Sequence, residues 1–166
     1  MSVTEDLASL SAARPAGYAS LADLLDRAEI NDLISRMNAC LDEHRFDELS
    51  SLYVEDATID TPGGGLITGR DGVVAEATRS HGVFERLQHT TTNVLIDLDG
   101  DRAEARANMI AGMARNGLQP DAILGGVNTY KVVRTPEGWR FASVVVRPIW
   151  RDDRKAAAAA AQPTAG

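Results

Sequence analysis

Histidine is the residue type in this chain best suited to moving protons near neutral pH, because an unperturbed imidazole has a pKa of about 6.5. The chain has three histidines. His89 opens a stretch rich in Thr, Val and Ile, where period-two spacing places it on one strand face with Thr91 and Asn93. A polar face of this kind can line a pocket, although an exposed or structural histidine fits the same pattern. His44 and His81 lie in polar turn segments, so we expect both to be exposed.

Asp42 is the first carboxylate that the spacing singles out. With Ser35 and Asn38 it lies at three-and-four spacing along one edge of a predicted helix, beside its apolar stripe. The carboxylate is therefore expected at the border of the core. From the spacing alone, a solvated acid in the turn before the next helix is the simpler interpretation. Asp60 is a rival general base if its side chain faces a cavity.

A carboxylate next to an imidazole would fix its tautomer, so that the free ring nitrogen can take a proton and return it elsewhere. Elimination, aldol cyclisation and ketalisation need such a group, and none requires a nucleophile or a metal. We predict no metal, because Asp42 and His44 have no histidine pair or third ligand nearby in sequence. Cys40 falls among apolar helix positions, which favours a buried thiol. Glycines 63–65 lack the lysine of a phosphate loop and suggest a flexible pocket lip.

Helical patterns occupy the first half of the chain. Apolar residues recur at three-and-four spacing from Leu21 to Leu41, which predicts an amphipathic helix that a break near Arg27 could divide. A shorter helix is predicted over 46–53. A short strand over 57–61 should end at the proline and glycines that follow it, and a capping-box-like pattern over 68–71 should begin a third helix.

The second half changes to strand periodicity. Alternating or β-branched stretches predict strands over residues 88–98, 102–113, 124–134 and 139–148, with turns at 99–100 and 135–138. Helices followed by a long antiparallel sheet are typical of the α+β class. We predict a cone-shaped, curved antiparallel or mixed sheet that the N-terminal helices close around a pocket.

Length and charge limit the function classes. The 166 residues, 44% of them hydrophobic, fit one domain, which we place at 18–153. It lies between a flexible N-terminal arm, 1–17, and a disordered Ala-rich tail, 154–166. A net charge of -7 disfavours nucleic acid or an anionic membrane as a partner. The N-terminus has acids where a signal peptide needs bases, and no segment is apolar enough to span a bilayer, so a cytoplasmic location is expected.

Two segments resemble a known family. The stretch FDELSSLYVEDATIDTPGGGLITG, residues 46–69, is similar to the helix–strand segment of SnoaL-like and ketosteroid-isomerase-like proteins, and the ending YKVVRTPEGWRFASVVVRPIW resembles their last hairpin. The resemblance covers roughly residues 24–150 and implies the nuclear transport factor 2-like fold. This fold hosts isomerases, dehydratases, polyketide cyclases, epoxide hydrolases and binding domains, so the reaction must be argued from the pocket.

The resemblance also assigns a role to Asp42. In scytalone-dehydratase-like members, an acid at the corresponding helix position orients a histidine in a Gln-His strand motif, which here matches Gln88 and His89. It therefore implies that Asp42 holds His89. The match is partial, because two family tyrosines correspond to Leu41 and Thr61, and a second family histidine falls near Met113.

A true scytalone dehydratase is therefore not expected. A steroid isomerase is not expected either. Ketosteroid isomerases carry their base one residue before the proline of "DP", where this chain has Thr61, with Asp60 on the opposite strand face.

We predict a pocket with His89 and Asp42 as catalytic residues and a mixed polar and apolar lining. The expected substrate-binding residues are Asn38, Asp60, Thr61, Asn128, Tyr130, Met109, Met113 and Trp150. Such a lining suits a flat, hydrophobic, oxygenated small molecule. Arg147, with Trp150, is a weaker candidate for the rim.

The predicted function is that of a cofactor-free dehydratase or cyclase acting on an aromatic polyketide-like or phenolic intermediate. Two alternatives stay open, a non-catalytic ligand-binding or accessory dimeric domain and the small subunit of a ring-hydroxylating dioxygenase. We expect a homodimer, because Ala142 and Val146 have the opposite parity to Trp139 and Phe141 and leave a sheet face for a second copy.

Overall fold

The computed structural model of the chain describes residues 20–153, so the expected arm 1–17 and tail 154–166 lie outside the described residues. Helices come first and long strands follow. The elements are α2 (Leu21–Asp42), η1 (Phe46–Leu52), β1 (Tyr53–Thr61), β2 (Gly65–Thr68), α3 (Arg70–His81), β3 (Arg86–Asp99), β4 (Arg102–Ala114), β5 (Ala122–Thr135) and β6 (Gly138–Asp152). This order confirms the predicted α+β class.

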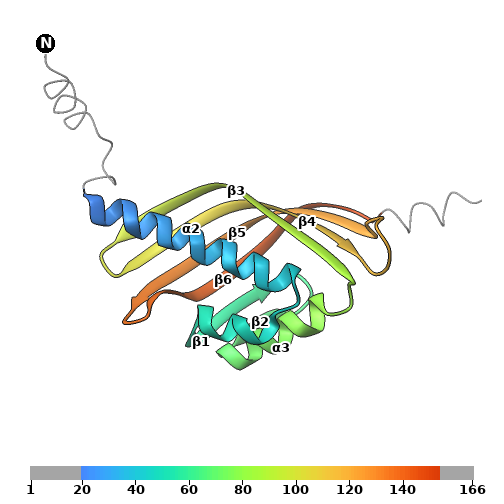
Figure 1. Ribbon diagram of the computed structural model, residues 1–166, viewed down its shortest axis with the longest axis horizontal. Helices are drawn as coiled ribbons and strands as arrows, with labels where there is room; N and C mark the ends of the chain where they lie inside the picture. The colour runs from blue at the N-terminus through green and yellow to red at the C-terminus, as the bar shows by residue number, and fades with distance from the viewer. Residues whose placement is uncertain (1–19, 154–166) are drawn as a thin grey trace, which may run out of the picture.

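The six strands form one curved sheet that does not close into a barrel. Their order is β2-β1-β6-β5-β4-β3. The pair β1 and β6 is parallel, and all other neighbours are antiparallel, so the sheet is mixed. α2 runs along one face of the sheet, and η1 and α3 gather beside β1 (Figure 1). We call the face that packs against α2 the inner face and the opposite one the outer face.

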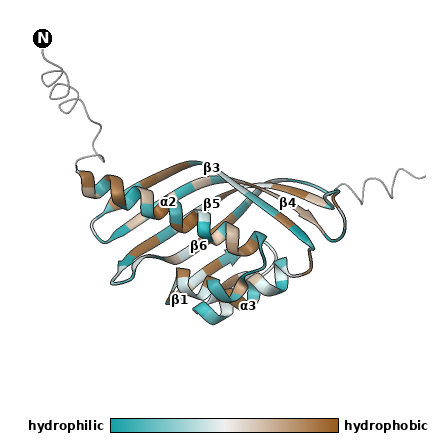
Figure 2. Ribbon diagram, viewed as in Figure 1, coloured by the Kyte–Doolittle hydropathy of each residue, from teal (hydrophilic) through white to brown (hydrophobic). Residues whose placement is uncertain are grey.

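The long helix α2 is continuous. Its N-terminus has a capping box in which Ser20 and Asp23 each accept the other's backbone N–H. Hydrophobic and hydrophilic residues alternate along it (Figure 2), and its buried positions include Ile30, Ile34 and Cys40. The helix has no break near Arg27, where one was considered. The Arg27 guanidinium donates a hydrogen bond to the backbone carbonyl of Ile96 on β3.

Two local predictions were wrong. The segment 46–52 is a 3-10 helix, and β1 starts at Tyr53, four residues before the predicted strand. The capping box expected at 68–71 is not formed, because Thr68 is still the last residue of β2. Gly69 caps α3 instead, with a left-handed φ of 88° and no side-chain hydrogen bond.

A bulge in β3 corrects the predicted strand faces. Thr92 pairs with Asn108 and Leu95 with Arg106, so β3 has one extra residue here, and Asn93 has a left-handed φ of 54°. The extra residue reverses the alternation of side chains. His89 therefore shares the inner face with Ile96, whereas Asn93 is exposed. The predicted polar face of His89, Thr91 and Asn93 is thus interrupted at its third member.

A second bulge affects the predicted dimer surface. Lys131 pairs with Ser143 and Val132 with Phe141, which leaves Ala142 unpaired in β6. After this bulge Val146 lies opposite Asn128 and packs against the core, so it belongs to the inner face. The expectation that Val146 faces a second copy was wrong for this reason.

The core lies between α2 and the inner face. Three small residues of β4, Ala103, Ala105 and Ala107, let the helix approach the sheet, and Tyr130 and Phe141 fill the remaining volume. In the described part of the chain, no helix has the length and apolar character needed to cross a membrane.

Candidate active site

Asp42 and His89 are in direct contact. The Nδ1 atom of His89 lies 2.6 Å from Oδ1 of Asp42. The backbone N–H of His89 also donates to both carboxylate oxygens, at 3.1 and 2.9 Å. Because a carboxylate only accepts, Nδ1 carries the proton and Nε2 has a free lone pair. The contact that the resemblance implied is therefore present, with an added backbone contact that fixes the carboxylate.

The chain around the end of α2 explains why the two residues meet. α2 ends at Asp42, and His44 turns the chain with a left-handed φ of 57°. The Nε2 atom of His44 lies 2.9 Å from the carbonyl oxygen of Phe84, to which it donates. Phe84 lies just before β3, so this bond ties the helix end to the strand that carries His89. The expectation that His44 is solvent-exposed was wrong, since it is half-buried.

The dyad is largely withdrawn from water. The side chain of His89 is 9% exposed and that of Asp42 is 21% exposed. A carboxylate at a helix C-terminus faces the negative end of the helix dipole, which disfavours it. The N–H donors of His89 offset this cost, and the same carboxylate would stabilise an imidazolium formed when Nε2 takes a proton.

Four polar residues form a row beside the dyad. Asn38 of α2 donates to the hydroxyl of Thr91 at 2.8 Å, and Asn128 donates to the hydroxyl of Tyr130 at 3.1 Å. A further hydrogen bond joins Thr91 to Tyr130. Burial raises the pKa of Tyr130, and the bonds from Asn128 and Thr91 partly offset this, so the phenol stays protonated at neutral pH.

The row ends in an unsatisfied acceptor. Asn128 is 4% exposed, and its Oδ1 is the only buried side-chain N or O atom within residues 20–153 that has no hydrogen-bond partner. Such a group is costly unless a water molecule or a ligand satisfies it. The predicted residues Asn38, Asn128 and Tyr130 are therefore brought together on the inner face, and one of them has spare bonding capacity.

A cavity of about 580 Å³ opens next to Asp42. Its walls combine the apolar residues Leu87, Met113 and Leu118 with polar and charged ones, Glu43, Glu85, Arg86 and Gln88. Met109 lies deeper on the inner face, where it pairs with Thr91 across β3 and β4 and is buried. His89 does not line the cavity and lies immediately behind Asp42.

His81 is the site residue that the sequence interpretation missed. It is the last residue of α3 and is half-buried, not exposed as expected. Its ring centre lies 5.5 Å from that of His89. Burial, together with the nearby charge of His89, lowers the pKa of His81 to about 4. A usable signal existed, because His81 follows Val73 and Ala77 at helical spacing on the buried side of α3.

Three other predicted residues lie elsewhere. Asp60 is bonded to Arg147 at 2.9 Å on the outer face, so it is not a rival base in this cavity. Trp150 pairs with Gly125, and its indole ring lies over the side of Gly125 where a Cβ would be. Ile110 pairs with Gly125 on the same side and is half-exposed, so Trp150 also lies on the outer face. Thr61 accepts a bond from the backbone of Gly64 in the turn to β2.

The placements expected for Asp60, Arg147 and Trp150 are therefore corrected. In β6, Ile149 lies between Pro148 and Trp150 and has no partner on β5, so the side chain of Trp150 changes to the other face of the sheet. For Asp60 and Arg147, strand parity combined with an ion pair keeps both side chains on the outer face.

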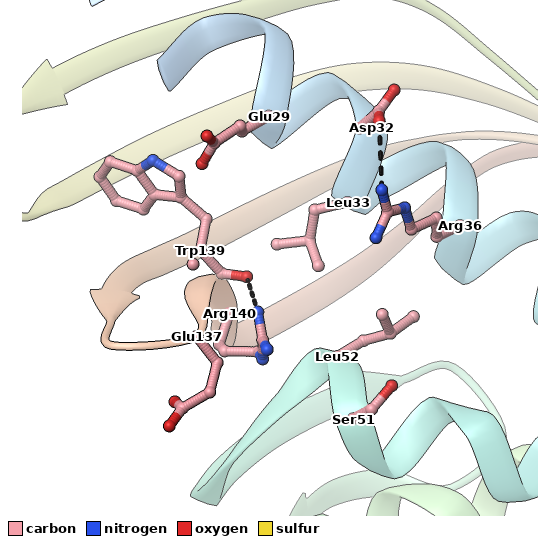
Figure 3. Close-up of a pocket in the computed structure, with 10 residues that line it drawn as sticks. Glu29, Asp32, Leu33, Arg36, Ser51, Leu52, Glu137, Trp139 and Arg140 are labelled. Atoms are coloured by element: carbon pink, nitrogen blue, oxygen red, sulfur yellow. Dashed lines mark hydrogen bonds and ion pairs between the residues drawn. The ribbon is translucent and has the colours of Figure 1, made fainter. Parts of the chain in front are cut away.

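A second cavity, of about 320 Å³, lies near the β5–β6 turn (Figure 3). Asp32 and Arg36 form an ion pair at its edge, with side chains 71% and 70% exposed. None of its lining residues is a histidine. Its polar groups are thus open to solvent and include no base with a fixed tautomer. In the part of the chain that the structure describes, no three His, Cys, Asp or Glu side chains gather in a way that could hold a metal ion.

Comparisons with known proteins agree with this architecture. The family model described as a SnoaL-like domain matches residues 22–145. Rv2910c of Mycobacterium tuberculosis, an uncharacterized protein, is 32% identical over 124 residues, which are 74% of this chain and 84% of that protein.

Two solved structures are similar. Kfla4162 from Kribbella flavida is 28% identical, with a TM-score of 0.72 over 78% of this chain and 94% of that one. A candidate scytalone dehydratase from Novosphingobium aromaticivorans is 25% identical, with a TM-score of 0.73 over 79% and 89%. The family match spans most of the described chain, so this protein belongs to the SnoaL-like domain family.

Proposed function

We propose that this protein is a cofactor-free lyase, a dehydratase or cyclase, that works by general acid/base catalysis. The observation that carries the proposal is the bond of 2.6 Å between Nδ1 of His89 and Oδ1 of Asp42, with the carboxylate also held by the backbone of His89. This arrangement presents one base with a fixed tautomer in direct contact with Asp42, which lines the cavity. The similarity to a candidate scytalone dehydratase supports the same class of reaction.

Dehydration at this site needs no reactant other than the substrate. Nε2 of His89 takes a proton from the carbon next to a substrate carbonyl, and Asp42 stabilises the imidazolium. The electrons of the broken C–H bond form a C=C bond as the C–O bond of the neighbouring hydroxyl breaks. The imidazolium returns its proton to the departing oxygen, which leaves as water. His89 is then neutral again.

The cavity lining offers apolar contacts beside polar and charged ones, which suits a substrate with an apolar body and oxygen-bearing groups. Met113 and Leu118 offer apolar contact, and Leu118 is 85% exposed at the mouth of the cavity. Asn128 lies outside the cavity lining, and its unsatisfied Oδ1 can accept a hydrogen bond from a phenol or an alcohol of a ligand that reaches the polar row. We therefore propose an aromatic polyketide-like or phenolic intermediate as substrate.

The test compares turnover of wild type, His89→Ala and Asp42→Asn on a panel of hydroxylated aromatic ketones, with product mass recorded for loss of water. Removing a general base typically costs 10²- to 10⁴-fold in rate, and we expect about this loss in both variants. Asp60→Asn is the matched control, because it removes an acid of the outer face. Wild-type turnover in His89→Ala, with water still lost, would contradict the proposal.

One observation favours a ligand-binding or accessory role as the second candidate. The cavity reaches Asp42 but not His89, as a site that only binds would allow. That role predicts ligand affinity without turnover, and a dioxygenase small subunit predicts a large partner chain that copurifies.

We also propose a homodimer across the outer face of the sheet. Ile110 and Trp150 are each 49% exposed there, which suits burial against a second copy. Light scattering of wild type and Trp150→Glu tests this, and an unchanged monomeric mass in both would contradict it.

A further inference from the structure

His81 and His89 form a pair of imidazoles supplied by different elements. Their ring centres are 5.5 Å apart and the rings are tilted by 42°. His81 is at the end of α3, and His89 is in β3, which begins after a short connection. The proposed reaction uses only His89, so the second ring has no role in it.

The contacts of His81 fix its tautomer. Its Nδ1 lies 3.2 Å from the carbonyl oxygen of Ala77, and a carbonyl oxygen only accepts. Nδ1 also lies 2.8 Å from Oγ of Ser80, whose hydroxyl lies 2.7 Å from the carbonyl of Glu76 and donates to it. Nδ1 of His81 therefore carries the proton, and Nε2 carries the lone pair.

Both rings thus hold their protonated nitrogen against the protein. His89 directs Nδ1–H to Asp42, and His81 directs Nδ1–H to Ala77 and Ser80. Within residues 20–153, no hydrogen bond engages Nε2 of either ring. The Nε2 atoms of His81 and His89 are therefore two acceptors without a donor in a half-buried place, and a ligand with a hydroxyl group can donate to them.

We propose that His81 is a substrate-binding residue whose Nε2 accepts a hydrogen bond from a substrate hydroxyl and so positions the substrate against His89. The inference rests on the proposed function and names a hydroxyl-bearing substrate for that site. The two rings are direct neighbours, with centres 5.5 Å apart, so a small molecule bound at His89 is also near His81.

The charge state of His81 fits an acceptor. Burial and, to a smaller extent, the charge of His89 together lower its pKa to about 4, against the raising effects of the Ala77 carbonyl and the carboxylates of Asp42 and Glu76. His81 is therefore neutral near pH 7 and keeps its lone pair. Below pH 4 it gains a proton and loses the ability to accept.

The first experiment compares His81→Gln with His81→Asn. The side-chain oxygen of Gln can take the place of Nε2 as an acceptor, whereas the amide of Asn can replace only the Nδ1–H donor to Ala77. We expect kcat/KM to fall roughly tenfold in His81→Asn, the cost of one lost hydrogen bond, and to fall less in His81→Gln. A purely structural role predicts the opposite order, because Asn would keep the bond within the helix. Thermal melting of both variants reports any loss of folding.

The second experiment needs no substrate. Imidazole resonances followed by NMR during a pH titration should give His81 a pKa near 4 in wild type. This pKa should rise in His89→Gln, which removes a neighbouring positive charge, and fall in Asp42→Asn, which removes a negative one. An ordinary pKa for His81 that does not change in His89→Gln would overturn the proposal, because the two rings would then not share one environment.

The outcomes separate this inference from the proposed function. Loss of turnover in His89→Ala and Asp42→Asn, together with wild-type kcat/KM in His81→Asn, overturns the role of His81 alone. Wild-type turnover in His89→Ala overturns the proposed function, and the inference with it. A larger loss in His81→Asn than in His81→Gln supports both.

Discussion

Two pairs of an aspartate and a nitrogen-bearing side chain lie on opposite sides of the sheet, at similar distances and in different surroundings. Asp42 and His89 lie 2.6 Å apart on the inner face, with side chains 21% and 9% exposed. Asp60 and Arg147 lie 2.9 Å apart on the outer face, with side chains 31% and 60% exposed. Only the first pair combines an imidazole, which can both take and give a proton, with a backbone N–H that fixes the carboxylate. Burial and orientation, more than distance, make a charged pair a candidate catalytic site.

The largest expected effect comes from a double-mutant cycle on each pair. If Asp42 acts only through His89, then Asp42→Asn, His89→Ala and the double variant should all lose about 10²- to 10⁴-fold in turnover, with no further loss in the double. The corresponding cycle on Asp60 and Arg147 should change turnover less than about twofold. Additive losses at Asp42 and His89, measured as initial rates, would show that the two residues act separately.

The two faces should also differ in their contribution to stability. Ile34 is buried on α2, so Ile34→Ala should lower the free energy of unfolding by about 2–5 kcal/mol. In the monomer Ile110 is half-exposed on the outer face, so at protein concentrations where the proposed dimer dissociates Ile110→Ala should cost less than about 1 kcal/mol. Urea denaturation of both variants measures the difference. Equal costs would mean that the outer face is also a packed core, as in a tightly associated dimer.

Protonation of His81 should weaken the fold in acid. Its folded-state pKa of about 4 lies below the unfolded value of about 6.5, so the unfolded chain binds the proton first as pH falls. Stability should therefore drop between pH 6.5 and 4 by up to about 3 kcal/mol, and this contribution should be constant below pH 4. His81→Gln should show a shallower drop in urea titrations across that range. Parallel curves for wild type and variant would contradict the low pKa.

The smallest expected effect concerns the exposed pair. An exposed ion pair contributes about 0–1 kcal/mol and is screened by salt. Asp60→Asn should therefore change the free energy of unfolding by less than about 1 kcal/mol, and the change should shrink in 1 M NaCl. A larger, salt-insensitive cost would indicate that this pair is as firmly held as the inner one.

Most of the fold followed from periodicity. The predicted helix over 21–41 and the four later strands match α2 and β3–β6 within a few residues, because long periodic segments report burial directly. The bulges at Asn93 and Ala142 could not be predicted in this way. Each adds one residue to a strand and reverses its faces, and neither has a distinctive local sequence.

The candidate site was predictable only in part. The 47-residue separation of Asp42 and His89 is bridged by tertiary packing, and their pairing was expected because of the family resemblance. In scytalone-dehydratase-like members a second histidine corresponds to a position near Met113, whereas this chain has its second imidazole, His81, at the end of α3. Trp150 was misplaced because the irregular end of β6 changes which face its side chain occupies.

The most direct test of the central claim is chemical rescue of His89→Ala with free imidazole. The variant removes the ring and leaves Asp42 in place to hold a replacement, so turnover should be low without imidazole and rise to a plateau as imidazole is added. Asp60→Asn, which keeps both histidine rings, controls for a general effect of imidazole on the reaction with the same additions. Wild-type turnover in His89→Ala before any imidazole is added would contradict the account, since the base at the centre of the site would then be unnecessary.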